Sequence, residues 1–92
     1  MIGLLRLKIT ETDSFCNNIN TLKSTVLAIE KDREVYIKSL ISLLTLDLSK
    51  EITVEIISDD EKELKRFREI IELYGGKIIE NYWTKGWNYY TD

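Results

Sequence analysis

The sequence predicts an α+β fold in which helices cover one face of a four-stranded antiparallel sheet. Four segments have the alternating pattern or the β-branched composition of strands. Three further segments have apolar residues at helical spacing, and the last of these is the longest. The 92 residues suffice for one domain. The expected order is β-α-β-β-α-β-α, which corresponds to an open-faced β-sandwich.

The first strand is expected in residues 4–9. Leu5, Leu7 and Ile9 alternate there with Leu4, Arg6 and Lys8, so the first row is predicted to face the core and the second to face water. Residues 10–18 break this pattern with side chains that favour turns and helix caps. A short helix is predicted from about residue 13 to residue 23, and its inward positions are Phe15, Ile19 and Leu22.

The middle of the chain predicts a hairpin and a second short helix. Residues 25–30 and 34–38 are rich in β-formers and flank a polar three-residue loop at residues 31–33. Residues 39–48 are too apolar for a surface loop, and a helix of one to two turns capped by Ser39 fits them. A fourth strand is expected in residues 52–56, where apolar and polar residues alternate.

The longest helix has start and stop signals of its own. Ser58 and Glu61 have the spacing of a capping box, and acidic residues fill the first turn, where the helix dipole favours them. Gly75 marks the C-terminal end. The apolar stripe that predicts the buried face consists of Leu64, Phe67, Ile70, Ile71 and Tyr74.

Composition excludes several functional classes. The chain has no histidine, so Ser-His and Cys-His nucleophile pairs and ordinary zinc sites are absent, and we expect neither a metal nor a cofactor. The single Cys16 forms no internal disulfide and suggests a reducing, cytoplasmic compartment. A net charge of −3 without a basic block argues against a nucleic-acid partner. The N-terminal apolar segment is too short and too charged for membrane insertion.

Residues 38–48, with the run Lys-Ser-Leu-Ile-Ser-Leu-Leu-Thr-Leu-Asp-Leu, carry a resemblance to a known family. Together with the strand at residues 52–56 and the acidic helix after Ser58, they resemble HPr, the phosphocarrier of the phosphoenolpyruvate-dependent sugar phosphotransferase system. The resemblance covers residues 5–74. It implies an HPr-like domain in residues 1–74 and a C-terminal extension in residues 75–92.

The resemblance places Cys16 at the position of the family's phosphorylated histidine. It places Asn18 at the position of the family's phosphate-binding arginine and Ile19 at the position of the family's proline. The chain is therefore expected to be a non-catalytic interaction or regulatory module related to the phosphotransferase system. The alternative is a variant phosphocarrier in which Cys16 accepts the phosphoryl group. The nearest cations available to such a carrier, Lys8 and Lys23, do not stand at the family's arginine position.

Two further roles follow from the resemblance. In some bacteria the family's serine at the position of Ser39 is the target of a regulatory kinase, although helix capping alone also accounts for this residue. The same surface docks partner proteins, which implies contacts through Leu40, Ile41 and Leu44 with proteins of the phosphotransferase system. Packing favours an inward orientation for Leu43, Leu46 and Leu48.

The C-terminal extension is rich in aromatic residues. Five of the nine aromatic side chains of the protein lie there: Tyr82, Trp83, Trp87, Tyr89 and Tyr90. The segment is predicted either to form a hairpin that turns at residues 84–86 or to add a strand to a sheet edge. It is expected to pack on the core or on a second copy of the chain. A third functional hypothesis is therefore an oligomerisation module without a phosphotransferase partner.

Overall fold

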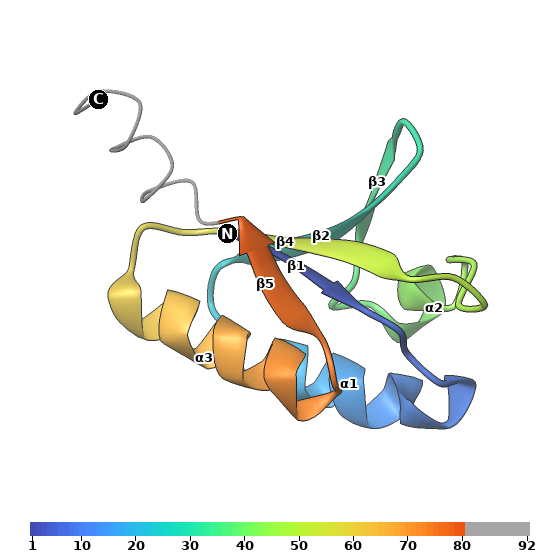
Figure 1. Cartoon of the computed structure of the whole chain (residues 1–92), viewed down its shortest axis with the longest axis horizontal. Helices are drawn as coiled ribbons and strands as arrows, with labels where there is room; N and C mark the ends of the chain where they lie inside the picture. Colours follow the sequence, from blue (N-terminus) through green and yellow to red (C-terminus); the bar gives the residue numbers. More distant parts are fainter. Residues whose placement is uncertain (81–92) are drawn as a thin grey trace.

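A five-stranded antiparallel sheet forms the centre of the structure, a computed structural model that describes residues 1–80 (Figure 1). The strands lie in the order β3-β2-β4-β1-β5, and all neighbours are antiparallel. Their bounds are Ile2–Leu5 for β1, Thr25–Glu30 for β2, Arg33–Tyr36 for β3, Ile52–Ile57 for β4 and Lys77–Glu80 for β5. The expected α+β class is confirmed, but within residues 1–80 the sheet has five strands instead of four.

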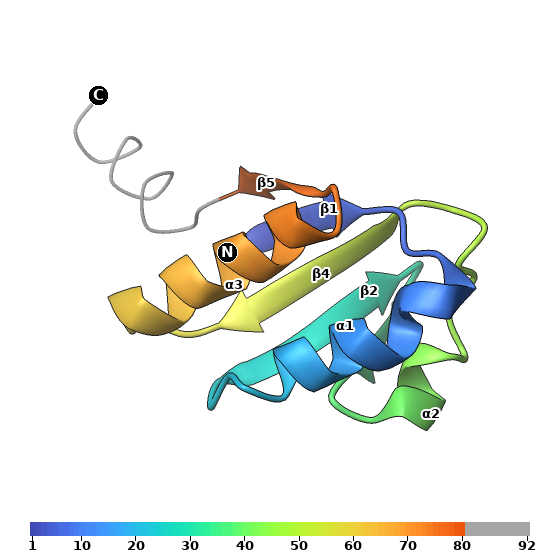
Figure 2. The same cartoon turned by 90° about the horizontal axis from the view of Figure 1, so that it is seen from below.

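Three α-helices of the described part complete the fold. Helices α1 (Thr12–Ile19) and α3 (Glu61–Leu73) lie on the same side of the sheet (Figure 2). The short α2 (Leu40–Leu43) contacts α1 and β3. A 3-10 helix, η1 (Ile9–Glu11), leads directly into α1.

The main core fills the space between the helices and the sheet. The predicted stripe of α3 is buried at Leu64, Phe67, Ile70 and Ile71, and Tyr74 packs partly buried against it. From α1, Phe15 and Ile19 enter the same cluster, followed by Leu22 after the helix. The sheet contributes Leu5, Val26, Ala28, Val35, Ile52, Val54 and Ile56. The inward positions predicted from helical spacing are therefore confirmed.

The prediction for the first strand is wrong in its bounds. Strand β1 lies at Ile2–Leu5, where Ile2 pairs with Glu55 and Leu5 with Ile52 of β4. Leu5 and Leu7 are buried as expected, but Ile9 lies in η1 and is 70% exposed. The side-chain alternation continues past the last residue that pairs in the sheet, so the alternation alone does not show where the strand ends.

The prediction of a capping box at Ser58 is also wrong. The N-cap of α3 is Asp60, whose Oδ1 accepts a hydrogen bond from the Lys62 amide at 2.9 Å. The hydroxyl of Ser58 instead accepts from the amide of Asp60 at 3.1 Å. Aspartate and serine are equally good N-caps, so neighbouring candidates compete and the sequence does not decide between them.

The other boundaries differ from the predictions by a few residues. The hairpin turn contains two residues instead of three, because Glu30 and Arg33 pair across it. Lys31 in this turn has a left-handed φ of 58°. Helix α1 ends at Ile19, four residues earlier than expected. The ends of helices and strands fray, so residue type and spacing place them less exactly than they place the buried face.

Two adjacent glycines connect α3 to β5. Gly75 has a φ of 80°, which ends the helix as predicted. Gly76 lies too close to β1 and α3 for a side chain, because a Cβ there would lie 2.6 Å from Leu5 Cβ and 2.8 Å from Ile71 Cγ2. Strand β5 then pairs with β1 from Lys77 onward. The hairpin predicted around residues 84–86 lies outside the described residues.

Candidate docking surface

Helix α2 presents apolar side chains to solvent. Ser39 is its N-cap, and the hydroxyl accepts a hydrogen bond from the Ser42 amide at 3.4 Å. In this four-residue helix Leu43 is completely buried, and Leu40, three residues earlier on the same face, packs partly buried beside it. Ile41 on the other side is 79% exposed, and Leu44 at the C-cap is 45% exposed.

The residues predicted as partner contacts therefore differ in accessibility. Ile41 and Leu44 are exposed, whereas Leu40 is half-buried and packs against the main core. The predicted inward residues Leu43 and Leu46 are buried, and Leu48 is half-buried. Ile41 and Leu44 are thus the predicted contact residues that a partner reaches most directly.

An open groove of about 620 Å³ extends this surface toward the N-terminal segment. One wall comes from the residues between β1 and η1, and the other from those after α2. The groove is lined by Arg6, Leu7, Lys8, Ile9, Leu44, Leu46, Asp47, Leu48 and Ser49. Sequence reasoning missed Ile9 because it assigned this residue to a strand, although the polar run after it indicated that the chain leaves the sheet.

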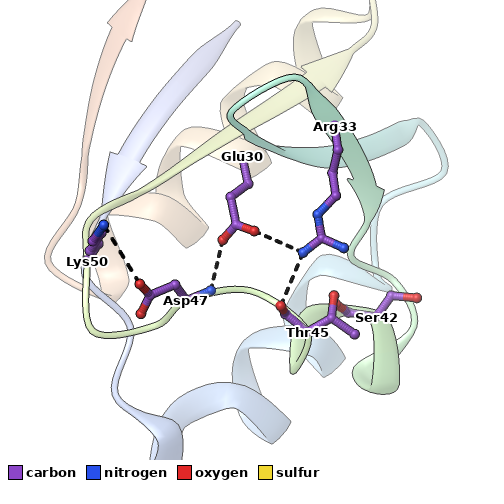
Figure 3. Close-up of polar contacts among 6 residues, drawn as sticks. All are labelled: Glu30, Arg33, Ser42, Thr45, Asp47 and Lys50. Carbon is purple, nitrogen blue, oxygen red and sulfur yellow. Dashed lines mark hydrogen bonds and ion pairs between the residues drawn. The ribbon is translucent and has the colours of Figure 1, made fainter.

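A polar network holds the loop after α2 against the β2–β3 hairpin (Figure 3). The Glu30 carboxylate accepts from Arg33 Nη2 and from the Asp47 amide, both at 2.9 Å. The same Arg33 nitrogen donates to the carbonyl of Thr45 at 3.1 Å. The hydrogen bond from the Asp47 amide, together with Arg33, lowers the pKa of Glu30. The position of Leu44 and Leu46 is therefore fixed by charge-assisted contacts as well as by packing.

Cys16 lies beneath the segment that leads into α2. Its side chain is 5% exposed, and the thiol donates to the carbonyls of Lys38 at 3.3 Å and Ile37 at 3.6 Å. The Asn20 amide donates to the same Lys38 carbonyl at 2.9 Å and to Cys16 Sγ at 3.5 Å. Burial, and next the charge of Asp13, raise the pKa of the Cys16 thiol. Cys16 and Asn20 thus join α1 to the residues before Ser39.

Asn18 faces a different neighbour from Cys16. Its amide nitrogen donates to the Tyr74 hydroxyl at 3.0 Å, and its amide oxygen accepts from Arg66 Nη2 at 3.0 Å. Ser14 and Tyr74 share a hydrogen bond of 2.8 Å in the same cluster. Asn18 therefore connects α1 to α3, whereas Cys16 connects α1 to the segment before α2. The two residues do not combine into one site.

For Lys8 and Lys23, the two cations considered for Cys16, the hydrogen bonds described are those of the backbone amides. The Lys8 amide donates to Glu11 Oε1 at 2.9 Å, and the Lys23 amide donates to Glu63 Oε1 at 2.7 Å. Within residues 1–80, the side chain that donates to Cys16 Sγ is the neutral amide of Asn20. The exposed side chains of Ile41 and Leu44 are the part of this arrangement that is suited to apolar contact with another protein.

Three comparisons with known proteins bear on this surface. The family model described as the phosphorylation site of the HPr component of the phosphotransferase system matches residues 5–74. The search of curated proteins and the search of solved structures each found no match. In the part of the chain that the structure describes, no helix has both the length and the apolar character needed to cross a membrane.

Proposed function

The chain belongs to the HPr family of the phosphotransferase system, and on that premise we propose that it docks on proteins of this system without carrying phosphate. One observation supports this most directly. The 92 residues contain no histidine, whereas the surface at α2 exposes Ile41 and Leu44. In this proposal the chain keeps the docking surface of the family and does not carry out its phosphoryl transfer. A cytoplasmic location belongs to the same proposal.

The environment of Cys16 argues against the variant phosphocarrier. Nucleophilic attack on a phosphoryl group requires a thiolate that reaches the donor. The Cys16 thiol is buried, donates to backbone carbonyls and has a raised pKa, all of which favour the neutral, inaccessible form. Its contacts instead support a structural role beneath the docking surface.

The docking surface has the composition expected of a protein interface. Ile9 and Leu44 supply exposed apolar area on the two sides of the groove, and Ile41 adds exposed apolar area on α2. Arg6 and Lys8 add positive charge along one wall. This combination favours a partner whose surface presents apolar side chains beside carboxylates.

Ser39 is retained in this proposal as a candidate for regulatory phosphorylation. Its side chain is exposed and lies at the start of α2, next to Leu40 and Ile41. A phosphate at this position adds about two negative charges beside the apolar surface and so weakens docking of an apolar partner.

The docking proposal is tested with Enzyme I, the phosphoryl donor of the family, by titration calorimetry. We expect Ile41→Asp to weaken binding at least about tenfold, because loss of a central apolar contact in an interface costs about 2 kcal/mol and about 1.4 kcal/mol already corresponds to a factor of ten. Leu73→Asp is the matched control, since Leu73 is a similarly exposed apolar residue on α3. Equal affinities of the wild type and both variants would contradict the proposed surface.

The phosphate-free role is tested separately by intact-mass spectrometry after incubation with phosphoenolpyruvate and Enzyme I. We expect the mass of the chain to stay unchanged. A gain of one phosphoryl group that is lost in Cys16→Ala would instead establish the cysteine carrier.

A further inference from the structure

The face of the sheet that points away from the helices carries a row of apolar residues. Directly paired residues of antiparallel strands share a face. Ile2 pairs with Glu55, Glu55 pairs with Leu27, and Leu27 pairs with Tyr36. A Cβ at Gly3 would lie 3.1 Å from Ile71 of α3, so the row through Gly3 faces the helices and the row through Ile2 faces the opposite side.

Neighbouring rows add further apolar residues to this open face. By the same register, Leu4 and Ile29 lie across from Thr53, and Ile57 pairs with Thr25. The apolar residues of the open face are Ile2, Leu4, Leu27, Ile29, Tyr36 and Ile57. A sheet face in water normally carries polar side chains, but here six apolar residues share the face with Thr25, Thr53 and Glu55, so the face is more apolar than a solvated one.

The burial of individual side chains distinguishes the core under the helices from the apolar residues of the open face. Ile2 and Leu27 are buried, yet they do not belong to the cluster packed under the helices. Tyr36 and Ile57 on the same face are 62% and 57% exposed. In residues 1–80 the helices α1 and α3 both lie on the other side of the sheet (Figures 1 and 2). The open face is therefore an apolar surface that neither α1 nor α3 covers.

We propose that residues 81–92 of the same chain cover this face. Strand β5 ends at Glu80, which pairs with Ile2, so the chain leaves the sheet at the edge end of the apolar row. From β5 to β3 there are four strand spacings, or about 19 Å. Twelve extended residues span up to about 40 Å, which is enough to cross the whole row.

The composition of residues 81–92 matches the surface that they would cover. Five aromatic side chains among twelve residues supply apolar area, and each buries about 150–250 Å². Indole N–H and phenol O–H groups also suit the half-buried Glu55, which interrupts the apolar row. Lys85 and Asp92 offset each other, so burial of the segment places no net side-chain charge on an apolar face.

Tryptophan fluorescence of the full chain tests this proposal, because both tryptophans of the protein, Trp83 and Trp87, lie in residues 81–92. We expect the native protein to resist acrylamide quenching, compared with the same protein unfolded in urea. The double variant Tyr36→Thr/Ile57→Thr removes apolar area from the open face but retains β-forming residues. We expect it to raise the quenching constant toward the unfolded value.

The control is Ile41→Thr, which removes an exposed isoleucine from α2 instead of the sheet and is expected to leave quenching unchanged. Circular dichroism verifies that each variant folds, and Ile57→Thr alone replaces the double variant if that one unfolds. Quenching of the native wild type as strong as in urea would overturn the proposal. Protection that disappears on dilution would also overturn it, because a second copy of the chain would then be the cover.

Discussion

Helices α3 and α2 use the same kinds of apolar residue for opposite purposes. Helix α3 has thirteen residues and directs Leu64, Phe67, Ile70 and Ile71 into the core. Helix α2 has four residues and buries Leu43, whereas Ile41 points into solvent. The long α3 forms a continuous inward stripe, whereas the single turn of α2 buries Leu43 completely and Leu40 in part. Helix length therefore determines which apolar residues stabilise the fold and which remain available for binding.

The two helices are also held in place differently. Apolar contacts with the sheet and with α1 fix α3. The N-cap hydroxyl of Ser39, the buried Leu43 and the hydrogen bonds of the following loop fix α2. The surface at α2 thus keeps its position although most of its own apolar area is not buried in the core.

The largest expected contrast between the helices comes from a pair of isoleucines. Ile70→Ala on α3 removes a completely buried side chain and should lower the free energy of unfolding by about 2–5 kcal/mol. Ile41→Ala on α2 should change it by less than about 0.5 kcal/mol. Urea denaturation of both variants measures the difference. Similar losses would mean that α2 contributes to stability as α3 does.

The two glycines at the end of α3 are expected to differ less in their effect on stability than Ile70 and Ile41. Gly76→Ala forces a methyl group into Leu5 and Ile71, and we expect a loss of about 1–3 kcal/mol. Gly75→Ala meets no neighbour within 4 Å and should cost about 1 kcal/mol through its left-handed backbone alone. Thermal unfolding ranks the two variants. The reverse order would show that the contact between this turn and β1 relaxes easily.

The smallest expected effect concerns acid stability. Glu63 of α3 accepts from the amides of Ser24 and Lys23 and from the Ser24 hydroxyl, and the Ser24 amide is the main cause of its lowered pKa. Because the pKa of Glu63 is lower in the folded state, its ionised form stabilises the fold at pH values above the ordinary pKa near 4.5. This contribution is lost as the pH falls through the folded pKa.

Glu63→Gln should therefore reduce stability at neutral pH and flatten its decline below about pH 4.5. Urea midpoints measured from pH 7 to pH 3 determine both effects. Glu69→Gln, on the exposed side of the same helix, is the control. An unchanged acid slope in Glu63→Gln would show that these hydrogen bonds do not persist in solution.

Much of the fold was predictable because helical spacing identifies buried positions reliably. The stripe of α3 and the cap of α2 at Ser39 follow from residue type and spacing alone. Ile9 was misplaced because alternation continues past the last paired residue of β1. The open-face residues Leu27 and Ile29 lie in a continuous apolar run, which does not reveal that they face away from the helices. The contacts of Cys16 with residues 37 and 38 depend on tertiary structure and leave no local signal.

The position of β1 in the sheet has a consequence for folding kinetics. The first strand of the chain lies between β4 and β5, so Ile2 pairs with both Glu55 and Glu80. The β2–β3 hairpin pairs residues that are close in sequence, so we expect it to form early. Strand β1 pairs with β4 and β5, which lie far along the chain, so we expect β1 to pair late. During synthesis on the ribosome, we expect the apolar N-terminus to stay without its strand partners until most of the chain has emerged.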